Sequence, residues 1–295
     1  MVYGRRPATT RTKTGRIIGL LVAALMMHSA ALASEEPLSF NVLNHRGVTL
    51  TAHYWNPILT YISHKTGVPL ELRLNKTSKE NTTIAETGVY DFLYTNHFFT
   101  PERDKLGYRV IARPAGPDIR SQLVVRKDSP VHSIKDLAGA EVAFPTPDGF
   151  TGYWLPMDFL LRTGIKVKPV FTGSQEASYG YLRDSRVVAA GVNSVALENY
   201  ARRTDFQYRV LWTSDPYKEL CIMANPKVPK EKVAAVQAAF VGMAKDPEGR
   251  KILQAGAQLL KQSGELGFVA ADNREYDNYR VFYRNTPLND HGTRH

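Results

Sequence analysis

The chain has 295 residues, of which 43% are hydrophobic and 22% are charged, and its 38 basic and 28 acidic residues give a formal net charge of +10. This composition is sufficient to bury a core, and it excludes a disordered, collagen-like or multispanning membrane chain. The one cysteine, Cys221, excludes an intramolecular disulfide and a cysteine-rich metal site. The length indicates one large domain or two smaller ones.

The first 33 residues have the layout of a secretory signal peptide. Five basic residues and no acidic ones precede an apolar run at 17–27, and the small-x-small sequence Ala31-Leu32-Ala33 follows. We therefore expect cleavage after Ala33 and a periplasmic protein, with 1–33 removed. A membrane anchor is the alternative, but the run is shorter than the roughly 20 apolar residues that a spanning helix needs.

Much of the positive charge lies in this leader. Without its five basic residues, 33 basic residues remain against 28 acidic ones, a net charge of +5. The remaining sequence has no concentrated stripe of lysine and arginine, so we expect no nucleic-acid partner and no membrane-surface patch.

Hydrophobic periodicity predicts alternating strands and helices along the rest of the chain. Strands are expected at 38–43, 69–74, 91–94, 109–113, 122–126, 141–144, 167–171, 187–192, 209–212 and 220–224. Helices are expected at 48–66, 78–87, 133–137, 151–163, 176–183 and 194–203, and over most of 230–260 and 273–283, before a polar tail. Gly67 is expected to end the first helix. This pattern indicates an α/β protein with mostly parallel sheets, divided into two domains.

Several short segments, in a fixed order, resemble one family. They are SQLVVRKDSP (121–130), SIKDLAG (133–139), VAFP (142–145), TGYWLP (151–156), FTGS (171–174) and VLWTSDP (210–216). Their order and spacing are similar to those of the phosphate/phosphite/phosphonate substrate-binding proteins of ABC importers. The similarity extends over about 38–253 and is strongest at 121–229.

The resemblance implies a bilobed periplasmic-binding-protein fold of type II, in which two α/β lobes are joined by two crossing strands. The first lobe would comprise 34–120 and 216–295, and the second 121–215, with crossings near 122–126 and 211–217. The implied function is a monomeric periplasmic solute-binding protein that holds a small oxyanion in the cleft and delivers it to an ABC permease. The alternative is a protein that presents its ligand to the periplasmic domain of a membrane sensor kinase.

The stretch 147–152, between a predicted strand and a predicted helix, is the first candidate binding segment. Unpaired N–H groups at a helix N-terminus and the helix dipole attract anions. The family pattern matches at Thr151 and Gly152, whereas Gly149 and Phe150 stand where the family carries hydroxyl residues. The alternative is an ordinary helix start with a buried Phe150.

Two further positions depart from the family pattern. Gln175 lies where the family often has histidine, and Ser194 lies where it often has an acid that meets a ligand amine or an acidic hydroxyl. Both residues can still donate hydrogen bonds, although Gln175 is also compatible with a solvated helix start. Because both expected groups are absent, we expect a receptor for another small oxyanion or a less charged solute rather than a phosphonate specialist, and weak binding of 2-aminoethylphosphonate.

Polar residues after two strands of the first lobe are the remaining candidates. The resemblance places Tyr94, Asn96 and His97 at the cleft, where each can donate to an anion, although these residues also suit a strand-end cap. His97 would carry charge only if its pKa rose above that of free imidazole. Arg46 can pair with an oxyanion in a fork geometry, or it can be a solvated side chain.

No catalytic or metal-binding pattern is present. His53 and His64 share a helix face but lie about 16 Å apart along it, too far for one ion. Cys221 lies in an apolar strand, which favours an inert buried thiol. There is no nucleophile elbow and no phosphate-binding P-loop. We therefore expect no enzyme, no metal and no cofactor.

Overall fold

The computed structural model describes residues 1–4, 36–44, 47–261 and 264–288, and every structural statement below concerns these residues. Contacts between residues divide the chain into Met1–Glu36 and Pro37–His295. The expected signal peptide lies almost wholly outside the described residues, as do Arg46 and the end of the polar tail. The fold is that of Pro37–His295.

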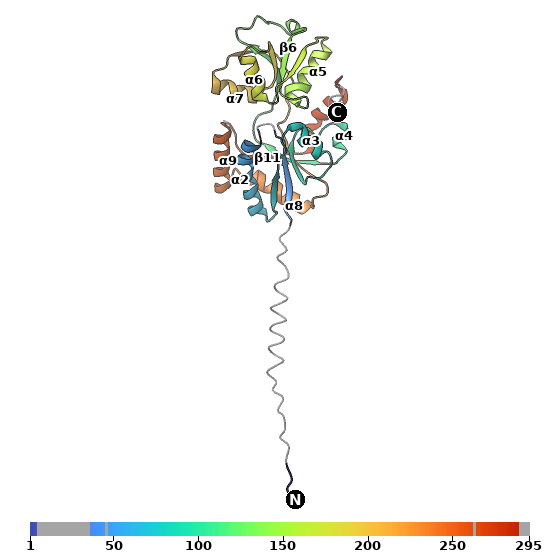
Figure 1. The fold of residues 1–295 in the computed structure, drawn as a ribbon, viewed down its shortest axis with the longest axis vertical. Coiled ribbons are helices and arrows are strands. Elements are labelled where there is room, and N and C mark those ends of the chain that lie inside the picture. Colours follow the sequence, from blue (N-terminus) through green and yellow to red (C-terminus); the bar gives the residue numbers. More distant parts are fainter. Residues whose placement is uncertain (5–35, 45–46, 262–263, 289–295) are drawn as a thin grey trace. The chain divides into compact units, whose positions relative to one another are not determined.

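Two sheets organise this unit, and Figure 1 shows each with its own group of helices. The six-stranded sheet has the order β11-β4-β10-β3-β1-β2, and the five-stranded sheet has the order β7-β6-β8-β5-β9. Strands of the first are β1 (Leu38–Val42), β2 (Leu70–Arg73), β3 (Phe92–Thr95), β4 (Arg109–Pro114), β10 (Cys221–Ala224) and β11 (Phe268–Ala270). Strands of the second are β5 (Ser121–Arg126), β6 (Glu141–Phe144), β7 (Lys168–Phe171), β8 (Ala189–Asn193) and β9 (Tyr208–Thr213). The predicted α/β class is confirmed.

The helices follow the same division along the chain. Those between strands of the first sheet are α2 (Val48–Thr66), α3 (Ser78–Ala85), α4 (Pro101–Asp104), α8 (Lys230–Gly242) and α9 (Pro247–Leu260). Those between strands of the second are η1 (Ile134–Leu137), η2 (Phe150–Trp154), α5 (Leu155–Arg162), α6 (Gln175–Arg183) and α7 (Ser194–Thr204). The chain then continues into η3 (Asn273–Tyr276) and α10 (Asp277–Asn285).

The expectation of mostly parallel sheets is wrong. β1 runs parallel to β2 and β3, and β6 runs parallel to β7 and β8, but β5 and β10 are antiparallel to both of their neighbours. A helix after a strand returns the chain for a parallel strand, whereas β5 and β10 each enter their sheet from the other one through an extended segment. Periodicity identifies an element but carries no information about its direction.

The two extended segments pair with each other between the sheets. Ile119 and Tyr217 exchange both backbone hydrogen bonds at 2.8 Å, and the N–H of Ser214 donates to the carbonyl of Ser121 at 2.9 Å. The expected crossing residues 122–126 instead lie within β5, and the paired connection lies just before it. Lobe boundaries at 120 and 216 stay a prediction, although the second sheet takes all of its strands from 121–213.

Local sequence signals explain several element boundaries. The helix predicted at 48–66 is confirmed, and it ends at Gly67, whose φ of 69° is in the left-handed region that glycine tolerates. The predicted helical region 230–260 is interrupted before α9, where Asp246 caps the new helix and Pro247 occupies its first turn. The sequence did not predict α4 or β11, which are too short to show a hydrophobic period.

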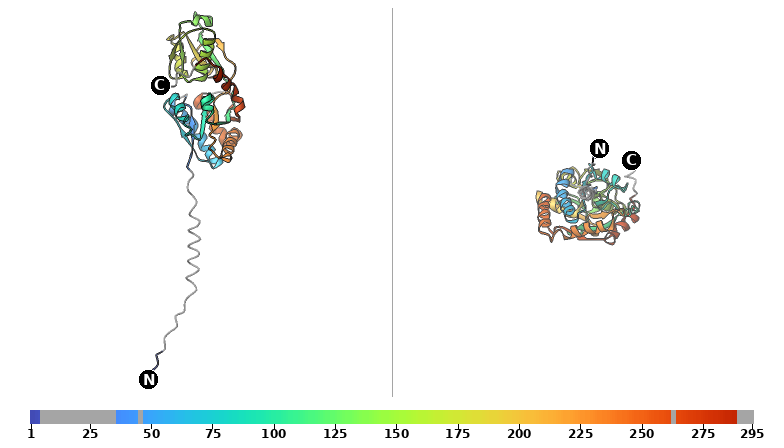
Figure 2. Two further views of the ribbon diagram at one scale, coloured as in Figure 1. Left: turned by 90° about the vertical axis from the view of Figure 1, so that its right-hand side faces the viewer. Right: turned by 90° about the horizontal axis from the view of Figure 1, so that it is seen from below.

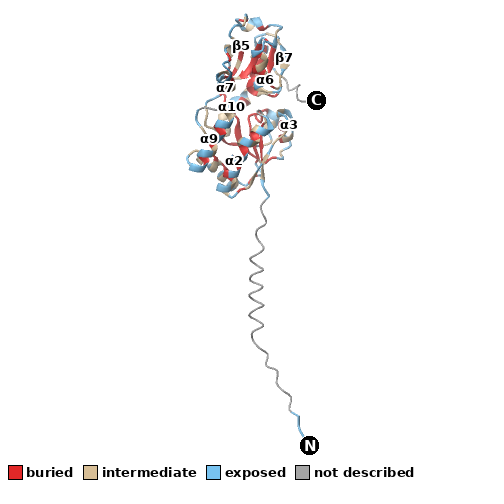
Figure 3. Ribbon diagram, turned by 60° about the vertical axis from the view of Figure 1, so that its left-hand side comes forward, coloured by how far each residue is buried: buried red, intermediate tan, exposed pale blue. Residues whose placement is uncertain are grey.

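Figure 3 shows buried residues concentrated on the strands of both sheets. One aromatic cluster also connects the two halves of the fold. The Phe150 ring from η2 stacks on Tyr279 of α10 at 4.2 Å between centroids, and it meets Tyr217 of the connection edge-on at 4.9 Å. Figure 2 shows the C-terminal segment beside both groups of elements, and Arg280 of α10 also pairs with Asp104 of α4 at 2.8 Å. This cluster fixes the start of η2.

Candidate ligand-binding site

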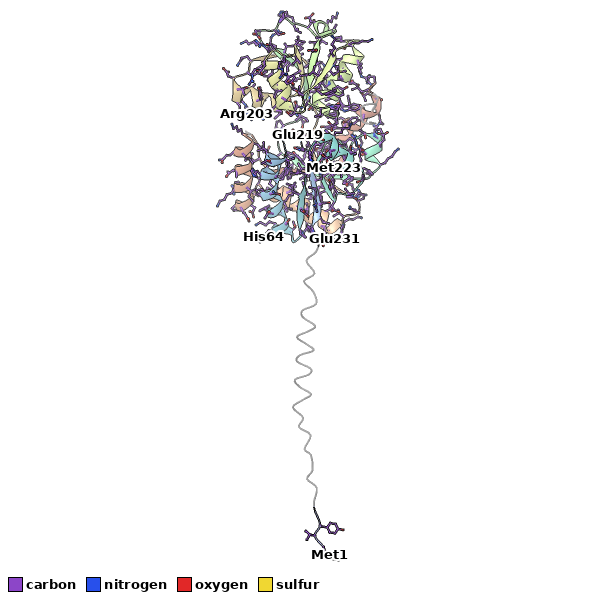
Figure 4. The ribbon with its side chains drawn as sticks, in the orientation of Figure 1. Met1, His64, Arg203, Glu219, Met223 and Glu231 are labelled. Atoms are coloured by element: carbon purple, nitrogen blue, oxygen red, sulfur yellow. The ribbon has the colours of Figure 1, made fainter. Side chains whose placement is uncertain are left out.

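A cavity of about 160 Å³ lies where strands of the two sheets end. Its wall is made by residues that follow the carboxyl ends of β1, β3, β6, β7 and β8, the usual position of ligands in α/β sheets. The lining residues are Leu43, Asn44, Ser78, Asn96, His97, Pro145, Thr146, Gly149, Phe150, Thr151, Gly173, Ser174, Gln175, Asn193, Val195, Ala196, Asn199, Glu219 and Leu220. Figure 4 labels Glu219 between the two groups of elements.

The start of η2 presents backbone donors at this cavity. The turn is π-helical, because the N–H of Trp154 donates to the carbonyl of Gly149 at 3.0 Å, five residues back. The N–H groups of Phe150, Thr151 and Gly152 donate to no acceptor among the described residues. Phe150 and Thr151 line the cavity, and the Thr151 hydroxyl likewise has no hydrogen-bond partner in the described part of the chain. Such unpaired donors at a helix start can hold an anion.

Gly152 does not line the cavity, but the turn depends on it. A Cβ at this position would lie 2.3 Å from Cγ of Pro145 and 2.9 Å from Nε2 of Gln175. The helix start can therefore approach the end of β6 only with glycine here. Gly149 has a negative φ of −70°, so its backbone conformation does not require glycine.

Gln175 has its side-chain amide fixed in one orientation. Its Oε1 accepts from the Tyr179 hydroxyl at 2.8 Å and from the Asn193 N–H at 3.4 Å. Its Nε2 has no acceptor among the described residues. Because Gln175 lines the cavity, this amide nitrogen is a free donor at the site. The alternative of a solvated side chain at a helix start therefore does not describe Gln175.

Phe150 combines the two roles that the sequence presented as alternatives. The residue is buried and packs in the aromatic cluster with Tyr217 and Tyr279, and it also lines the cavity. An aromatic residue replaces the expected hydroxyl because the side chain packs against α10. The backbone N–H of Phe150 is unaffected by that replacement.

On the opposite wall, His97 lies against Asp148, a residue of the loop after β6. His97 Nδ1 is 3.7 Å from Asp148 Oδ2, and the Ser78 hydroxyl donates to the same oxygen at 2.8 Å. Burial lowers the pKa of His97 and the nearby Arg103 lowers it further, against the opposing influence of Asp148. Burial acts to raise the pKa of Asp148, but the charge of a protonated His97 and hydrogen bonds from the Thr146 and Ser78 side chains bring it below its usual value.

Of the remaining sequence candidates, Asn96 lines the cavity, and Tyr94 and Ser194 lie off its wall. Tyr94 is buried in the first-sheet core, with its ring 4.7 Å from that of Trp55. The Ser194 hydroxyl accepts the N–H of Arg120 at 3.1 Å, so it joins the end of β8 to the connecting segment. Asn96 does line the cavity, and its Nδ2 donates to the hydroxyl of Tyr279 at 3.3 Å. Arg46 lies outside the described residues.

Sequence reasoning missed Ser78, Asn193 and Glu219 on the wall. Glu219 follows the extended connection, where no motif or periodicity marks it, and only the folded chain brings it to the cavity. Glu219 therefore brings a carboxylate to the cavity wall, although Ser194 stands where the family often has an acid. Among the described lining residues there is no lysine or arginine.

Cys221 and the metal-ligating residue types are the other reactive groups that the sequence raised. The Cys221 thiol is buried, its Sγ is 3.2 Å from the carbonyl of Thr95, and burial raises its pKa well above the usual range. No group of His, Cys, Asp or Glu in the described ranges is arranged to hold a metal ion. Across these same ranges, no helix has the length and apolar character to cross a membrane.

Comparison with known proteins agrees with this architecture. The family model described as "ABC transporter, phosphonate, periplasmic substrate-binding protein" matches residues 42–276. The chain therefore belongs to this family of periplasmic substrate-binding proteins of ABC transporters, and the resemblance found in the sequence is confirmed. A search of curated proteins finds no match.

Solved structures of this class have the same fold at low sequence identity. A binding-protein component of an ABC phosphonate transporter from Pseudomonas aeruginosa is 17% identical, covers 84% of this chain and 86% of its own, and has a TM-score of 0.69. PhnD1 from Prochlorococcus marinus, solved with methylphosphonate, is 17% identical, covers 84% and 97%, and has a TM-score of 0.70. A Xanthomonas citri protein solved with ATP is 17% identical, covers 84% and 96%, and has a TM-score of 0.67. The predicted two-lobed binding-protein fold of type II is confirmed.

Proposed function

We propose that this substrate-binding protein holds a small oxyanion of the phosphate, phosphite or phosphonate class in the cavity at the start of η2. The observation that carries the proposal is the set of free donors there. The backbone N–H groups of Phe150 and Thr151, the Thr151 hydroxyl and Nε2 of Gln175 have no acceptor among the described residues, and all three residues line the cavity. The N–H of the adjoining Gly152 also has no acceptor there. Hydrogen bonds to charged groups contribute about 1.5 to 3 kcal/mol each, so an oxyanion uses such donors better than a neutral solute does.

The size of the cavity supports a small ligand. Its volume of about 160 Å³ is close to that of an engineered protein cavity that binds benzene. Methylphosphonate, found in the Prochlorococcus structure, is of this size, whereas the ATP of the Xanthomonas structure is much larger. We therefore infer a ligand with one tetrahedral oxyanion group and little else.

The expectation of weak 2-aminoethylphosphonate binding stays a prediction. It rests on Gln175 and Ser194, which stand where the family has a histidine and an acid. Glu219 also lines the cavity, and its Oε1 accepts the N–H of Leu220 at 2.9 Å.

The family determines the kind of partner protein, and the sequence suggests the oligomeric state, the signal peptide and the lobe boundaries. A substrate-binding protein of this family works with an ABC permease, and no comparison supports the sensor-kinase alternative. We infer a monomer that is secreted to the periplasm by the signal peptide at 1–33, with lobes at 34–120 plus 216–295 and at 121–215.

A thermal-shift screen of the mature chain, followed by calorimetry, tests the proposal. Methylphosphonate, phosphite and phosphate are the probes, and glycerol is a neutral control. At a hundred times the dissociation constant, a ligand stabilises the folded state by about 2.7 kcal/mol, which gives a measurable rise in Tm. If none of the three oxyanions raises Tm or gives binding heat, the proposed class is wrong.

The variant Gln175→Glu locates the binding at this cavity. The new carboxylate keeps the acceptor that Tyr179 and Asn193 use, but it replaces the free donor with a negative oxygen. We expect oxyanion affinity to fall by more than about 100-fold, because a charge-assisted bond becomes a like-charge contact. The matched control is Glu176→Gln on the same helix, where the native carboxylate is exposed and pairs with Arg203. Unchanged affinity in Gln175→Glu would place any binding elsewhere.

A further inference from the structure

His97 presents one edge of its ring to an acid and a hydroxyl, and leaves its other nitrogen unused. Nδ1 lies 3.3 Å from the Thr82 hydroxyl and 3.7 Å from Asp148 Oδ2. Nε2 has no hydrogen bond within the described part of the chain, although the His97 side chain is only 6% exposed and the residue lines the cavity. Because Nδ1 is engaged, Nε2 is the nitrogen available to a ligand.

Asp148 is a buried charge with incomplete compensation. Its side chain is 8% exposed, Oδ2 receives the Ser78 hydroxyl, and Oδ1 is buried with no hydrogen-bond partner among the described residues. A buried carboxylate in this state gains from any nearby positive charge. The His97 imidazolium is the charge that the geometry offers, since the two groups meet across the loop ends after β3 and β6.

Other charged groups near His97 also affect whether its ring is protonated. Arg103 Nη1 donates to the His97 carbonyl at 3.0 Å, which opposes a second positive charge, and Arg103 is itself paired with Glu86 at 2.6 Å. Glu219 contributes a carboxylate to the same cavity wall. On α3, the neutral Thr82 contacts the His97 ring and the neutral Ser78 contacts Asp148. Burial and Arg103 both lower the pKa of the ring and so favour its neutral form.

We propose that oxyanion binding is coupled to the uptake of one proton by His97, with Asp148 as the buried counter-charge that holds the ring. This inference rests on the proposed oxyanion site. A proton from solvent adds to Nε2, Nδ1–H remains directed at Asp148, and Nε2–H donates to a ligand oxygen. The His97 imidazolium then lies between the Asp148 carboxylate and the ligand oxyanion, and the two negative charges favour the protonated ring.

The sign of the pH dependence follows from this arrangement. Because the ligand raises the pKa of His97, the extra affinity is present at low pH and is lost as pH rises through the pKa of the bound state. One linked proton changes affinity by up to tenfold per pH unit. In the bound state the protonated ring and the hydrogen bonds from Thr146 and Ser78 hold the pKa of Asp148 below its usual value.

Calorimetry with methylphosphonate measures the proton directly. Titrations at about pH 7 in two buffers of different ionisation enthalpy give the protons taken up on binding, for the wild type and for His97→Gln. Glutamine can still hydrogen-bond but cannot titrate, and the ligand's own ionisation is common to both proteins. We expect the wild type to take up as much as one proton more than His97→Gln, and Asp148→Asn to reduce this difference. The ratio of the two dissociation constants should change by up to about tenfold per unit between about pH 6 and 8.

Equal proton uptake by the wild type and His97→Gln would overturn the inference while leaving the proposed function intact. If no oxyanion binds the wild type, the proposed function fails and this inference fails with it. Should His97→Gln not fold, nitrogen NMR of the wild-type His97 ring provides the test. An imidazolium signal in the methylphosphonate complex supports the inference, and a neutral ring in the saturated complex overturns it.

Discussion

We expect that replacing Thr151 with valine removes one proposed ligand donor and almost nothing else. The residue is buried at the start of η2, and its hydroxyl has no hydrogen-bond partner in the described part of the chain. Its carbonyl accepts the Ser121 hydroxyl at 2.6 Å, a contact that the substitution leaves in place. Valine has nearly the same shape as threonine, so the loss is confined to the hydroxyl.

The expected loss of affinity for methylphosphonate is about 1 to 3 kcal/mol, or about 5- to 150-fold. This is the range for a hydrogen bond to a charged group whose partner is left unsatisfied. The ligand-free protein should change in unfolding free energy by less than about 1 kcal/mol, because no intramolecular hydrogen bond is broken. The combination of weaker binding with unchanged stability distinguishes a ligand contact from a structural one.

Isothermal calorimetry and denaturant unfolding measure the two quantities. Thr151→Ser retains the hydroxyl and should stay close to the wild type in affinity. Thr163→Val is the positional control, because Thr163 lies at the other end of α5, where its hydroxyl donates to the carbonyl of Phe159 at 2.9 Å. Unchanged affinity in Thr151→Val, or an equal loss in Thr163→Val, would refute the assignment.

Three other predictions test the turn, the leader and the hinge. Gly152→Ala should lower the unfolding free energy by roughly 1 to 3 kcal/mol, because the new Cβ would lie 2.3 Å from Cγ of Pro145. The control is Gly180→Ala in α6, where a Cβ has no atom within 4 Å and should not destabilise the protein. Equal denaturation midpoints for the two variants would contradict this prediction. Periplasmic protein should begin at Ser34 by N-terminal sequencing, and a membrane-bound product beginning at Met1 would contradict it. Small-angle scattering should give a smaller radius of gyration with saturating methylphosphonate, because lobe closure is expected, and an unchanged radius counts against a hinge.

The part of the site that the sequence could predict comes from strand ends. Carboxyl ends of neighbouring parallel strands meet at one edge of a sheet, so polar residues after β6 and β7 converge in the second sheet, as do those after β1 and β3 in the first. The two-lobed fold that the resemblance implies then places the two edges at one cleft. Asn96, His97, Thr151 and Gln175 all lie on the cavity wall for this reason. The resemblance added the order of these segments, which a periodicity argument alone does not supply.

The rest depended on contacts between distant segments. β3 is buried on both faces, so an alternating pattern cannot tell that Tyr94 points into the core rather than to the cleft. Ser194 is used by Arg120, a partner 74 positions away. Asp148 and Glu219 also acquire their significance only from what the folded chain places beside them.

The division of donors between backbone and side chains explains how this site can keep an anion-binding function at 17% identity to structures of its class. The N–H groups at 150–152 depend on the π-helical turn and on Gly152, and they stay available when phenylalanine replaces a hydroxyl residue at 150. We propose that discrimination between ligands falls to side chains, Gln175 on one wall and His97 with its buried Asp148 on the other. We expect a change at these side chains to alter which oxyanion binds and at what pH, and a change that unwinds the turn to remove the backbone donors that all such ligands would use.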